Sequence, residues 1–519
     1  MNATASHSHR FGVGAIVGVL SAGVALGVGE IVAAFVRPAA SPVIAVGNRF
    51  ILLTPESVKR WAIRTFQTSD KPVLLLGIYV GITLFAMAVG VLALRRLVYG
   101  LAGIAVFGAI GVYSALTANA ARGTDVVPTI VGAVAAAVAL VLLVRAAGAD
   151  DEFVEPAGLG PLVSDRRRFL QFGAAAAGLA VLSGFGGRAV QRARFSVEKI
   201  RDKLVLPKPV GAAPAAAANP DLGKSGVPWQ TPNSQFYRVD TALSVPQIDP
   251  KNWRLRIHGM VDRPMTLTYQ QLLARPQIER WITLCCVSNE VGGGLIGNAR
   301  FLGTRLADLL REAGVQPGAD QLVLSSDDGM TIGTPTAVVM DGRDSLLAVG
   351  MNGAPLPINH GFPVRTVVPG LYGYVSACKW IVDIEATTFS KRRAYWVDGG
   401  WAAQTDIKLE SRIDTPRSGQ SVAAGKPTAI AGVAWDQHVG VAKVQVQVGT
   451  GEWTDARLAP VPSTDTWRQW VLAWTPPGPG SYVVKVRAVD ARGDVQTAQV
   501  AQPFPSGATG LHTITVRAS

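Results

Sequence analysis

The sequence predicts an α-helical membrane region, then a globular α+β domain, then an immunoglobulin-like β-sandwich. Long uncharged apolar runs fill the chain before residue 195, mixed strand and helix patterns rich in Trp, Pro and Gly follow residue 225, and alternation of period two dominates after residue 411. At roughly 100–200 residues per domain, 519 residues accommodate about three units. We therefore expect a membrane region at 1–195, a linker at 196–225, the α+β domain at 226–410 and the sandwich at 411–519.

The first segment contains several stretches long enough to cross a bilayer as helices. Residues 11–36 are apolar apart from Glu30, and a transmembrane helix needs about 20 such residues. We predict four more spans, at about 73–94, 101–118, 126–145 and 169–189. A cleaved signal peptide does not account for several spans in a row.

Arginine positions predict how these spans are oriented. Arg95 and Arg96 lie between the second and third spans, and three arginines precede the fifth. The positive-inside rule places both loops in the cytoplasm, so the globular domains are expected on the extracytoplasmic side of the cytoplasmic (inner) membrane. The first loop is also basic and would face outward, against the rule.

The stretch "SDRRRFLQFGAAAAGLAVLSGFGG" (164–187) looks like a twin-arginine export signal, because Arg166 and Arg167 are followed at the usual distance by Phe169 and Leu170. An ordinary basic flank on a fifth helix is the alternative. Export by this route carries protein that has already folded in the cytoplasm.

The two globular units differ in pattern. "WRLRIHG" (253–259) is strand-like, whereas "TYQQLLAR" and "RLADLLREAG" have helical spacing. In "VAKVQVQVG" the residues Val444, Val446 and Val448 alternate with polar ones, and "SYVVKVRAVD" alternates in the same way. Short alternating strands separated by turns such as "PPGPG" predict a β-sandwich. The stretch 205–225, rich in Pro and Ala, predicts a linker.

Two of the three cysteines, Cys285 and Cys286, are neighbours in "WITLCCVSNEVGGG". A disulfide between adjacent residues is strained, although Cys378 could pair with one of them. A zinc site would need more Cys or His nearby, and a nucleophilic cysteine would need an activator such as His360. A single thiolate that ligates a soft metal, with other ligands from a cofactor, is the remaining alternative.

Several segments in order, over about residues 225–515, resemble the sulfite oxidase family of molybdenum enzymes. "WITLCCVSN" resembles the segment that carries the metal-ligating cysteine, which the resemblance places at Cys286, with Asn289 at a cofactor-binding position. "NGAPLPINHGFPVRTVVPGLYGYVSACKW" (352–380) is the strongest match. It places His360, Arg365 and Lys379 where the family holds molybdopterin.

Two shorter matches indicate residues that would face the substrate. "QFYRVD" (235–240) places Arg238 near the metal, and "KRRAYW" (391–396) places Tyr395 as an active-site tyrosine. The β-sandwich resembles the family's dimerisation domain, which implies a homodimer. The resemblance as a whole implies a membrane-anchored, sulfite-oxidase-like oxidoreductase that performs oxygen-atom transfer on a small oxyanion or oxide. Cys286 would tune the metal, Arg238 would orient the substrate and Tyr395 would donate a hydrogen bond to the transferred oxygen.

The residue types agree with this chemistry. A pterin with a pendant phosphate is anionic, arginine contacts phosphate in a bidentate manner and lysine acts as a point charge. The glycines at 292–294 let backbone approach a ligand closely. The alternatives without a functional role are a flexible loop for the glycines, a structural histidine for His360 and a packed tyrosine for Tyr395.

The chain departs from the family pattern where sulfite would bind. Glu290 and Val291 follow Asn289, where sulfite-oxidising members carry arginine, and the sandwich segment "GVAWDQHVG" offers His438 instead of a further arginine. A pocket without these charges holds a dianion poorly. An S-oxide or N-oxide reductase, or a membrane-anchored binding module without catalysis, are therefore alternatives. His438 could restore part of the charge when protonated.

Electrons must leave or enter through another protein. None of the six histidines lies in a predicted span, no C-x-x-C-H occurs, and three cysteines cannot hold a four-cysteine cluster. We therefore expect no haem and no iron–sulfur cluster, and a separate electron-transfer protein or quinone-linked partner. The net charge of +13 does not indicate nucleic acid, because no dense basic run occurs. A transporter would need more intramembrane charge than Glu30.

Overall fold

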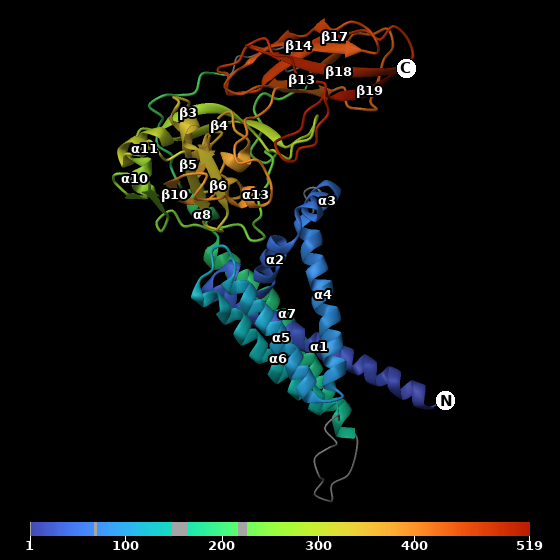
Figure 1. The fold of residues 1–519 in the computed structure, drawn as a ribbon. Helices are drawn as coiled ribbons and strands as arrows, with labels where there is room; N and C mark the ends of the chain where they lie inside the picture. Colours follow the sequence, from blue (N-terminus) through green and yellow to red (C-terminus); the bar gives the residue numbers. More distant parts are fainter. Residues whose placement is uncertain (1, 67–69, 148–162, 216–225) are drawn as a thin grey trace, which may run out of the picture. The chain divides into compact units, whose positions relative to one another are not determined.

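The computed structural model describes residues 2–66, 70–147, 163–215 and 226–519. These residues form two units. The first comprises Met1–Val197 with Thr241–Gln247, and the second comprises Glu198–Asp240 with Ile248–Ser519. The predicted succession of apolar helices, α+β domain and β-sandwich is confirmed (Figure 1).

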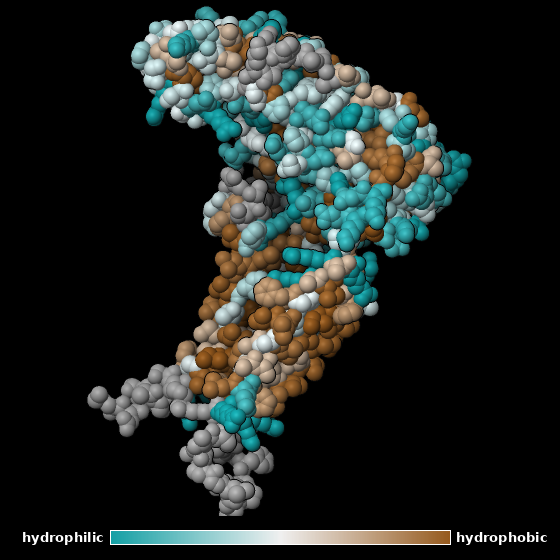
Figure 2. Space-filling view, turned by 180° about the vertical axis from the view of Figure 1, so that it is seen from behind, coloured by the Kyte–Doolittle hydropathy of each residue, from teal (hydrophilic) through white to brown (hydrophobic). Residues whose placement is uncertain are grey.

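The first unit is built from helices. They are α1 (Asn2–Val36), η1 (Pro38–Ala40), α2 (Pro42–Leu53), α3 (Glu56–Phe66), α4 (Asp70–Ala93), α5 (Leu97–Leu116), η3 (Gly123–Val126), α6 (Val127–Ala146) and α7 (Val163–Phe195). Within the described ranges five helices, α1 and α4 to α7, are long and apolar enough to cross a membrane. Figure 2 shows hydrophobic side chains over most of the visible surface of this bundle. Apolar side chains that face outward are what a bilayer accepts and water does not.

Helix α1 lies at the centre of the bundle and packs on α4, α6 and α7. A Cβ atom at Gly18 would lie only 1.8 Å from the carbonyl oxygen of Ala86, so α1 and α4 can touch only because this residue is glycine. Close approach at small residues is how helices associate in a bilayer, where no hydrophobic effect drives them together. At one end of the bundle the Arg37 Nε donates to the Asp125 carboxylate at 2.8 Å, which ties η1 to η3.

The first basic loop is more ordered than the sequence suggested. Residues 42–53 form α2, which begins at Pro42, a residue that suits a first helical position. Residues 56–66 form the amphipathic helix α3. This part of the basic loop is therefore helical and not an extended connection.

The second unit begins with α8 (Glu198–Asp202), which lies within the predicted linker at 196–225. Arg201 donates to the carbonyl oxygen of Leu356 at 2.8 Å, and the Val210 N–H donates to that of Gln277 at 2.8 Å. This segment, up to residue 215, therefore packs along the α+β domain. The exact domain boundaries remain a prediction.

The α+β domain contains a mixed sheet in the order β2-β1-β10-β5-β6, in which β1 and β10 are parallel, and an antiparallel sheet in the order β3-β4-β7-β8, with β9 added to β7. The strands are β1 (Arg254–Gly259), β2 (Met265–Thr268), β3 (Ile278–Cys285), β4 (Ile296–Arg305), β5 (Gln321–Ser326), β6 (Thr331–Pro335), β7 (Leu346–Met351), β8 (Ala354–Pro355), β9 (Arg365–Val367) and β10 (Ile381–Thr387). The helical pieces are α10 (Tyr269–Leu273), α11 (Leu306–Ala313), α12 (Thr336–Met340), η4 (Ile358–His360), η5 (Gly373–Val375) and α13 (Tyr395–Asp398). One core of buried residues, which includes Trp253, Leu324 and Ile384, holds the sheets together.

The C-terminal part is a sandwich of two sheets, in the orders β11-β13-β17-β16 and β12-β19-β18-β14-β15. Its strands are β11 (Glu410–Thr415), β12 (Ser421–Val422), β13 (Thr428–Trp435), β14 (Val441–Val448), β15 (Thr454–Asp455), β16 (Arg457–Leu458), β17 (Arg468–Trp474), β18 (Gly480–Asp490) and β19 (Thr513–Ala518). Val444, Val446, Val484 and Val486 lie in the core between the sheets, as the alternation predicted.

The sandwich is hydrogen-bonded directly to strand β3. The Thr283 N–H donates to the carbonyl oxygen of Asp465 at 3.0 Å, and the Trp467 N–H donates to the Thr283 hydroxyl at 2.8 Å. The Gln437 side chain donates to the Thr283 carbonyl at 3.1 Å. Because Thr283 is completely buried, these contacts join β3 and the sandwich into one structure.

Candidate active site

Strand β3 ends at the two adjacent cysteines, and the two thiols have different surroundings. Cys285, the last residue of β3, lies in the core, and its thiol donates to the Cys286 carbonyl oxygen at 3.5 Å. Burial raises the pKa of the Cys285 thiol well above its usual value, and the carboxyl group of Glu410 raises it further. Cys285 is therefore a protonated core thiol, which agrees with its interpretation as small buried packing.

The surroundings of Cys286 favour a thiolate more strongly. Burial raises the pKa of this thiol too, but hydrogen bonds from the backbone and side chain of Ser288 and the charge of Lys379 act in the opposite direction. Donors and a cation beside a sulfur stabilise its anionic, metal-binding form. All three cysteines are free thiols, so the pairing of Cys378 with a neighbour is not present. Of the two adjacent residues, Cys286 is the better prepared metal ligand.

Asn289 stabilises the turn that follows Cys286. Its N–H donates to the Cys286 carbonyl oxygen at 2.9 Å, and its side-chain oxygen accepts from the Leu295 N–H at 2.8 Å. The side-chain nitrogen of Asn289 is buried and has no partner among the described residues. A buried donor without an acceptor is costly, so this atom fits a bound group that carries acceptors.

His360, Arg365 and Lys379 come together because the chain folds back on itself between η4 and β10. Gly361 makes the fold possible. Its φ of +107° is in the left-handed region, and a Cβ there would lie 3.0 Å from the Arg365 Cβ and 3.1 Å from the Lys379 Cα. The Arg365 guanidinium donates to the His360 carbonyl oxygen at 3.2 Å. All three residues lie well inside the domain, with His360 6% and Arg365 5% exposed.

The charges of this cluster act on one another. Burial, together with the charges of Arg365 and Lys379, lowers the pKa of His360 to about 4, so His360 is neutral at pH 7. Burial lowers the pKa of Arg365 to about 10 and that of Lys379 to about 8. Asp240 opposes the shift at Lys379, since its carboxylate accepts from the Lys379 ammonium at 2.6 Å. Buried cations in such number need an anion, and one carboxylate supplies only part of that need.

Arg238 lies at the edge of the cluster. Its Nε donates to the same Asp240 oxygen at 2.7 Å, and its side chain is 33% exposed. Its charge contributes to the lowered pKa values of His360 and Lys379. The geometry therefore joins Arg238 to the residues that were expected to hold the cofactor.

Tyr237 belongs to the site, and the sequence analysis missed it. Its ring stacks on that of Phe236 with centroids 5.3 Å apart, and its hydroxyl would lie 3.6 Å from a Cβ at Gly373. Burial raises the pKa of the phenol well above 10, Cys286 and Cys285 raise it further, and Arg365 opposes them. The phenol is therefore within electrostatic reach of the sulfur and of the cofactor-side arginine. Its position beside Arg238 was the available signal, but an aromatic residue alone is usually packing.

Tyr395 and His438 are placed by other contacts. The Tyr395 N–H donates to the Thr331 hydroxyl at 3.1 Å, and its ring packs edge-on against Trp396 with centroids 5.0 Å apart. These contacts attach it to β6, and its role at the metal stays a prediction. The His438 Nδ1 lies 3.1 Å from the Asp465 carboxylate, with the side chain 41% exposed. Asp465 would compensate most of the charge that His438 gains on protonation.

The residues present fit a molybdopterin cofactor. The site offers one thiol with Ser288 donors and the Lys379 charge beside it, three cations at Arg238, Arg365 and Lys379, and the amide nitrogen of Asn289, which has no partner among the described residues. Cations and amide donors match an anionic phosphate and the acceptor atoms of a pterin.

Comparison with known families agrees with the geometry. Residues 242–396 match the family model "Oxidoreductase molybdopterin binding domain", and residues 410–516 match "Bacterial Ig domain". The first match contains the Cys286 turn and the cluster of His360, Arg365 and Lys379. The second coincides with the β-sandwich.

Individual relatives match part of the chain. Mitochondrial sulfite oxidase of Homo sapiens is 33% identical in an alignment of 321 positions that covers 52% of this chain and 58% of that protein. Sulfite oxidase of Gallus gallus is 30% identical over 52% of this chain and 69% of its own length. The uncharacterized oxidoreductase YuiH of Bacillus subtilis is 34% identical over 30% of this chain and 76% of its own length. The chain thus spans less than two thirds of the human protein, but most of the other two. It belongs to the sulfite oxidase family of molybdopterin-binding oxidoreductases.

Proposed function

We propose that the chain is a membrane-anchored molybdenum-cofactor oxidoreductase that catalyses oxygen-atom transfer on a small oxyanion or oxide. The observation that carries the proposal is the proximity of a Ser288-supported Cys286 thiol to the cationic cluster around Lys379. A packing cysteine needs no such donors, and the neighbouring Cys285 lacks them. The family relationship supports the same chemistry.

The proposed roles follow from position and charge. When bound, the molybdenum cofactor supplies a two-electron exchange coupled to oxygen-atom transfer. Cys286 would be the protein ligand of the metal, and Arg365, Lys379, neutral His360 and the Asn289 amide would hold the pterin and its phosphate. Arg238, at the open edge of the cluster, would orient the substrate. Tyr395 is proposed as a hydrogen-bond donor to the reacting oxygen, a role that Tyr237 is better placed to assist.

A second candidate is reduction of an S-oxide or N-oxide. It is favoured by Glu290 and Val291, which stand where sulfite-oxidising members carry arginine. Val291 packs against the Gly510 backbone region, where a Cβ would lie 3.6 Å away. Asp240 also occupies Arg238 and Lys379. A site with few uncommitted cations suits a neutral, polar oxide better than a dianion.

The proposal includes the cytoplasmic membrane as the location, with the second unit on the extracytoplasmic side. Arg167 and Phe169 of the twin-arginine-like motif lie on α7, whereas nothing is described of the Arg166 side chain. Electrons would be exchanged with a separate electron-transfer protein or a quinone-linked partner. A homodimer through the sandwich is proposed from the resemblance alone.

The decisive experiment measures molybdenum and pterin in the full chain, purified from a host that makes the cofactor, beside Cys286→Ser and Cys285→Ser. We expect one metal per chain, with an altered metal spectrum only in Cys286→Ser. Sulfite oxidation with an artificial acceptor and S-oxide reduction with an artificial donor then separate the two directions. Absence of molybdenum from the wild-type chain would contradict the proposed function.

A further inference from the structure

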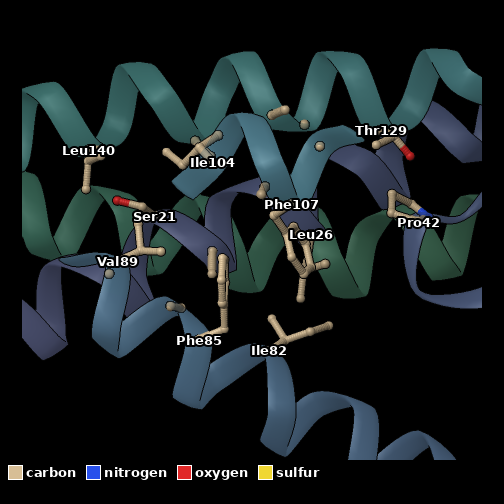
Figure 3. Close-up of a pocket in the computed structure, with 18 residues that line it drawn as sticks. Ser21, Leu26, Pro42, Ile82, Phe85, Val89, Ile104, Phe107, Thr129 and Leu140 are labelled. Atoms are coloured by element: carbon tan, nitrogen blue, oxygen red, sulfur yellow. The ribbon is translucent and has the colours of Figure 1, made fainter. Parts of the chain in front are cut away.

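The helical bundle encloses an apolar cavity that the oxidoreductase chemistry does not use. Its empty volume, which includes space open to the outside, is about 630 Å³. Helices α1, α4, α5 and α6 line it together with Pro42 at the start of α2 (Figure 3). All of these elements belong to the first unit.

The cavity exists because the surrounding helices lie at different distances from α1. α1 touches α6 at Gly132, where a Cβ would lie 2.5 Å from the carbonyl oxygen of Ala25. α5 is held further from α1, and the gap is lined by its Ile104 and Phe107. The Phe107 ring stacks on that of Phe85 of α4, with centroids 5.8 Å apart and an angle of 26° between the planes. Phe85 is 40% exposed on the outer surface of the bundle, so the cavity has a wall that faces lipid.

One polar atom in this apolar lining has no partner. The hydroxyl of Thr129 on α6 is buried and makes no hydrogen bond to any described residue, with the residue 7% exposed. Thr129 lies at the same end of the cavity as Pro42 (Figure 3). The other lining hydroxyl, that of Ser21, donates to the Val17 carbonyl at 2.8 Å. An unpartnered hydroxyl in a dry site costs free energy unless a ligand supplies the acceptor.

A buried carboxyl group lies behind the same end. Glu30, 7% exposed, accepts from the Ser41 hydroxyl at 2.7 Å and from the Gln191 amide at 3.0 Å. Ser41 directly precedes the cavity residue Pro42. Intramembrane carboxyl groups are expensive to bury and mark functional sites.

We propose that this cavity binds an isoprenoid quinone, with one ring carbonyl accepting from the Thr129 hydroxyl and the ring beside Phe85 and Phe107. The inference rests on the proposed membrane insertion. A quinone combines a flat ring, two carbonyl acceptors and an apolar tail, which match the aromatic pair, the free donor and the lipid-facing wall. A phospholipid acyl chain would fill the apolar space but leave the Thr129 donor unsatisfied.

The test uses the full chain in lipid nanodiscs with decylubiquinone as the probe, measured by thermal shift and by equilibrium binding. We expect saturable binding of one molecule per chain. Thr129→Val keeps the shape but removes the donor, and should weaken binding about 3- to 10-fold. Ala22→Phe, which fills the cavity, should abolish it. Thr83→Val is the matched control, because Thr83 is exposed on α4 and its hydroxyl donates within the helix at 2.8 Å.

Two outcomes would overturn the inference. One is binding that Thr129→Val and Ala22→Phe leave unchanged. The other is phospholipid that stays bound to the wild-type chain and is not displaced by decylubiquinone. Molybdenum content and oxygen-transfer activity are measured on the same preparations. A chain with metal and activity but no quinone binding contradicts only this inference, whereas a chain without metal contradicts the proposed function and leaves the cavity result standing.

Discussion

One oxygen of Asp240 accepts from two cations of the site, from the Lys379 ammonium at 2.6 Å and from the Arg238 Nε at 2.7 Å. The Asp240 side chain is only 5% exposed. The residue that should orient the substrate and a residue that should hold the cofactor are thus joined by one carboxylate. Anionic ligands must compete with it.

Asp240→Asn should strengthen the binding of anions. Without the carboxylate, Arg238 and Lys379 are available, and we expect a 3- to 10-fold lower KM for sulfite, on the order of 1 kcal/mol. Asp240 raises the pKa of Lys379, so the loss of its carboxylate lowers that pKa below about 8. The gain in anion binding is then confined to lower pH, where Lys379 is charged. Sulfate binding to cofactor-free protein, followed by thermal shift, gives a second readout. Asp383→Asn, which disturbs Arg256 and His258 instead, should change neither.

Tyr237→Phe should lower kcat more than it raises KM. The phenol remains protonated across the working pH range, because burial raises its pKa well above 10, so it serves as a permanent donor close to the metal ligand. We expect a loss of about 10-fold in kcat, or about 1.4 kcal/mol, and a shifted metal spectrum. Tyr269→Phe removes a different buried hydroxyl, which has no partner in the described part of the chain, and should preserve both. A normal spectrum and kcat in Tyr237→Phe would leave the phenol as packing.

The stability of the cofactor-free protein should fall on acidification because of His360. Its folded pKa is about 4, below the ordinary 6.5, so the unfolded chain takes up a proton first. The contribution is complete above pH 6.5 and is lost as the pH falls towards 4, by about 3 kcal/mol at the limit. The unfolding temperature of His360→Gln, measured from pH 7 to pH 4, should decline less steeply than that of the wild type. Parallel profiles would contradict the assignment.

Glu410→Gln should stabilise the protein at alkaline pH. Burial raises the pKa of this carboxyl group to about 8, and Oε1 has no partner among the described residues. The folded pKa lies above the unfolded value of 4.5, so the stabilising effect of the proton is complete below pH 4.5 and is lost as the pH rises through 8. Gln cannot ionise, and the gain at pH 8.5 should be several kcal/mol, on the order of 4. The control is Glu279→Gln, whose carboxylate pairs with Arg300 at 3.1 Å and should instead lose stability.

The sequence predicted those parts of the fold and of the site whose sequence pattern lies within one short segment. Apolar runs predicted the long helices and alternation predicted the sandwich strands, because both patterns repeat within one element. The segment around His360, Arg365 and Lys379 was accessible because its residues are close in sequence, and the structure does bring them together. Their cofactor roles stay predictions.

The rest required contacts between distant segments. Tyr237 stands beside Arg238 in the sequence, but that position alone did not distinguish an active-site phenol from core packing near a cysteine almost fifty residues later. Asp240 looked like an ordinary charge, and its pairing with Lys379 joins residues 139 positions apart. The two helices of residues 42–66 were not predicted, because their basic residues indicated a loop between spans although Pro42 can begin a helix.

The hydrogen bonds between Thr283 and the sandwich determine when the metal ligand can be positioned. Strand β3 precedes Cys286, but Trp467, which donates to Thr283, is added 184 residues later. At typical rates of about 5–20 residues per second, the ribosome has long passed the cysteines before their strand acquires its last partners. The surroundings of Cys286 are thus completed only after Trp467 has been added, and a chain that stops before it lacks these partners of β3.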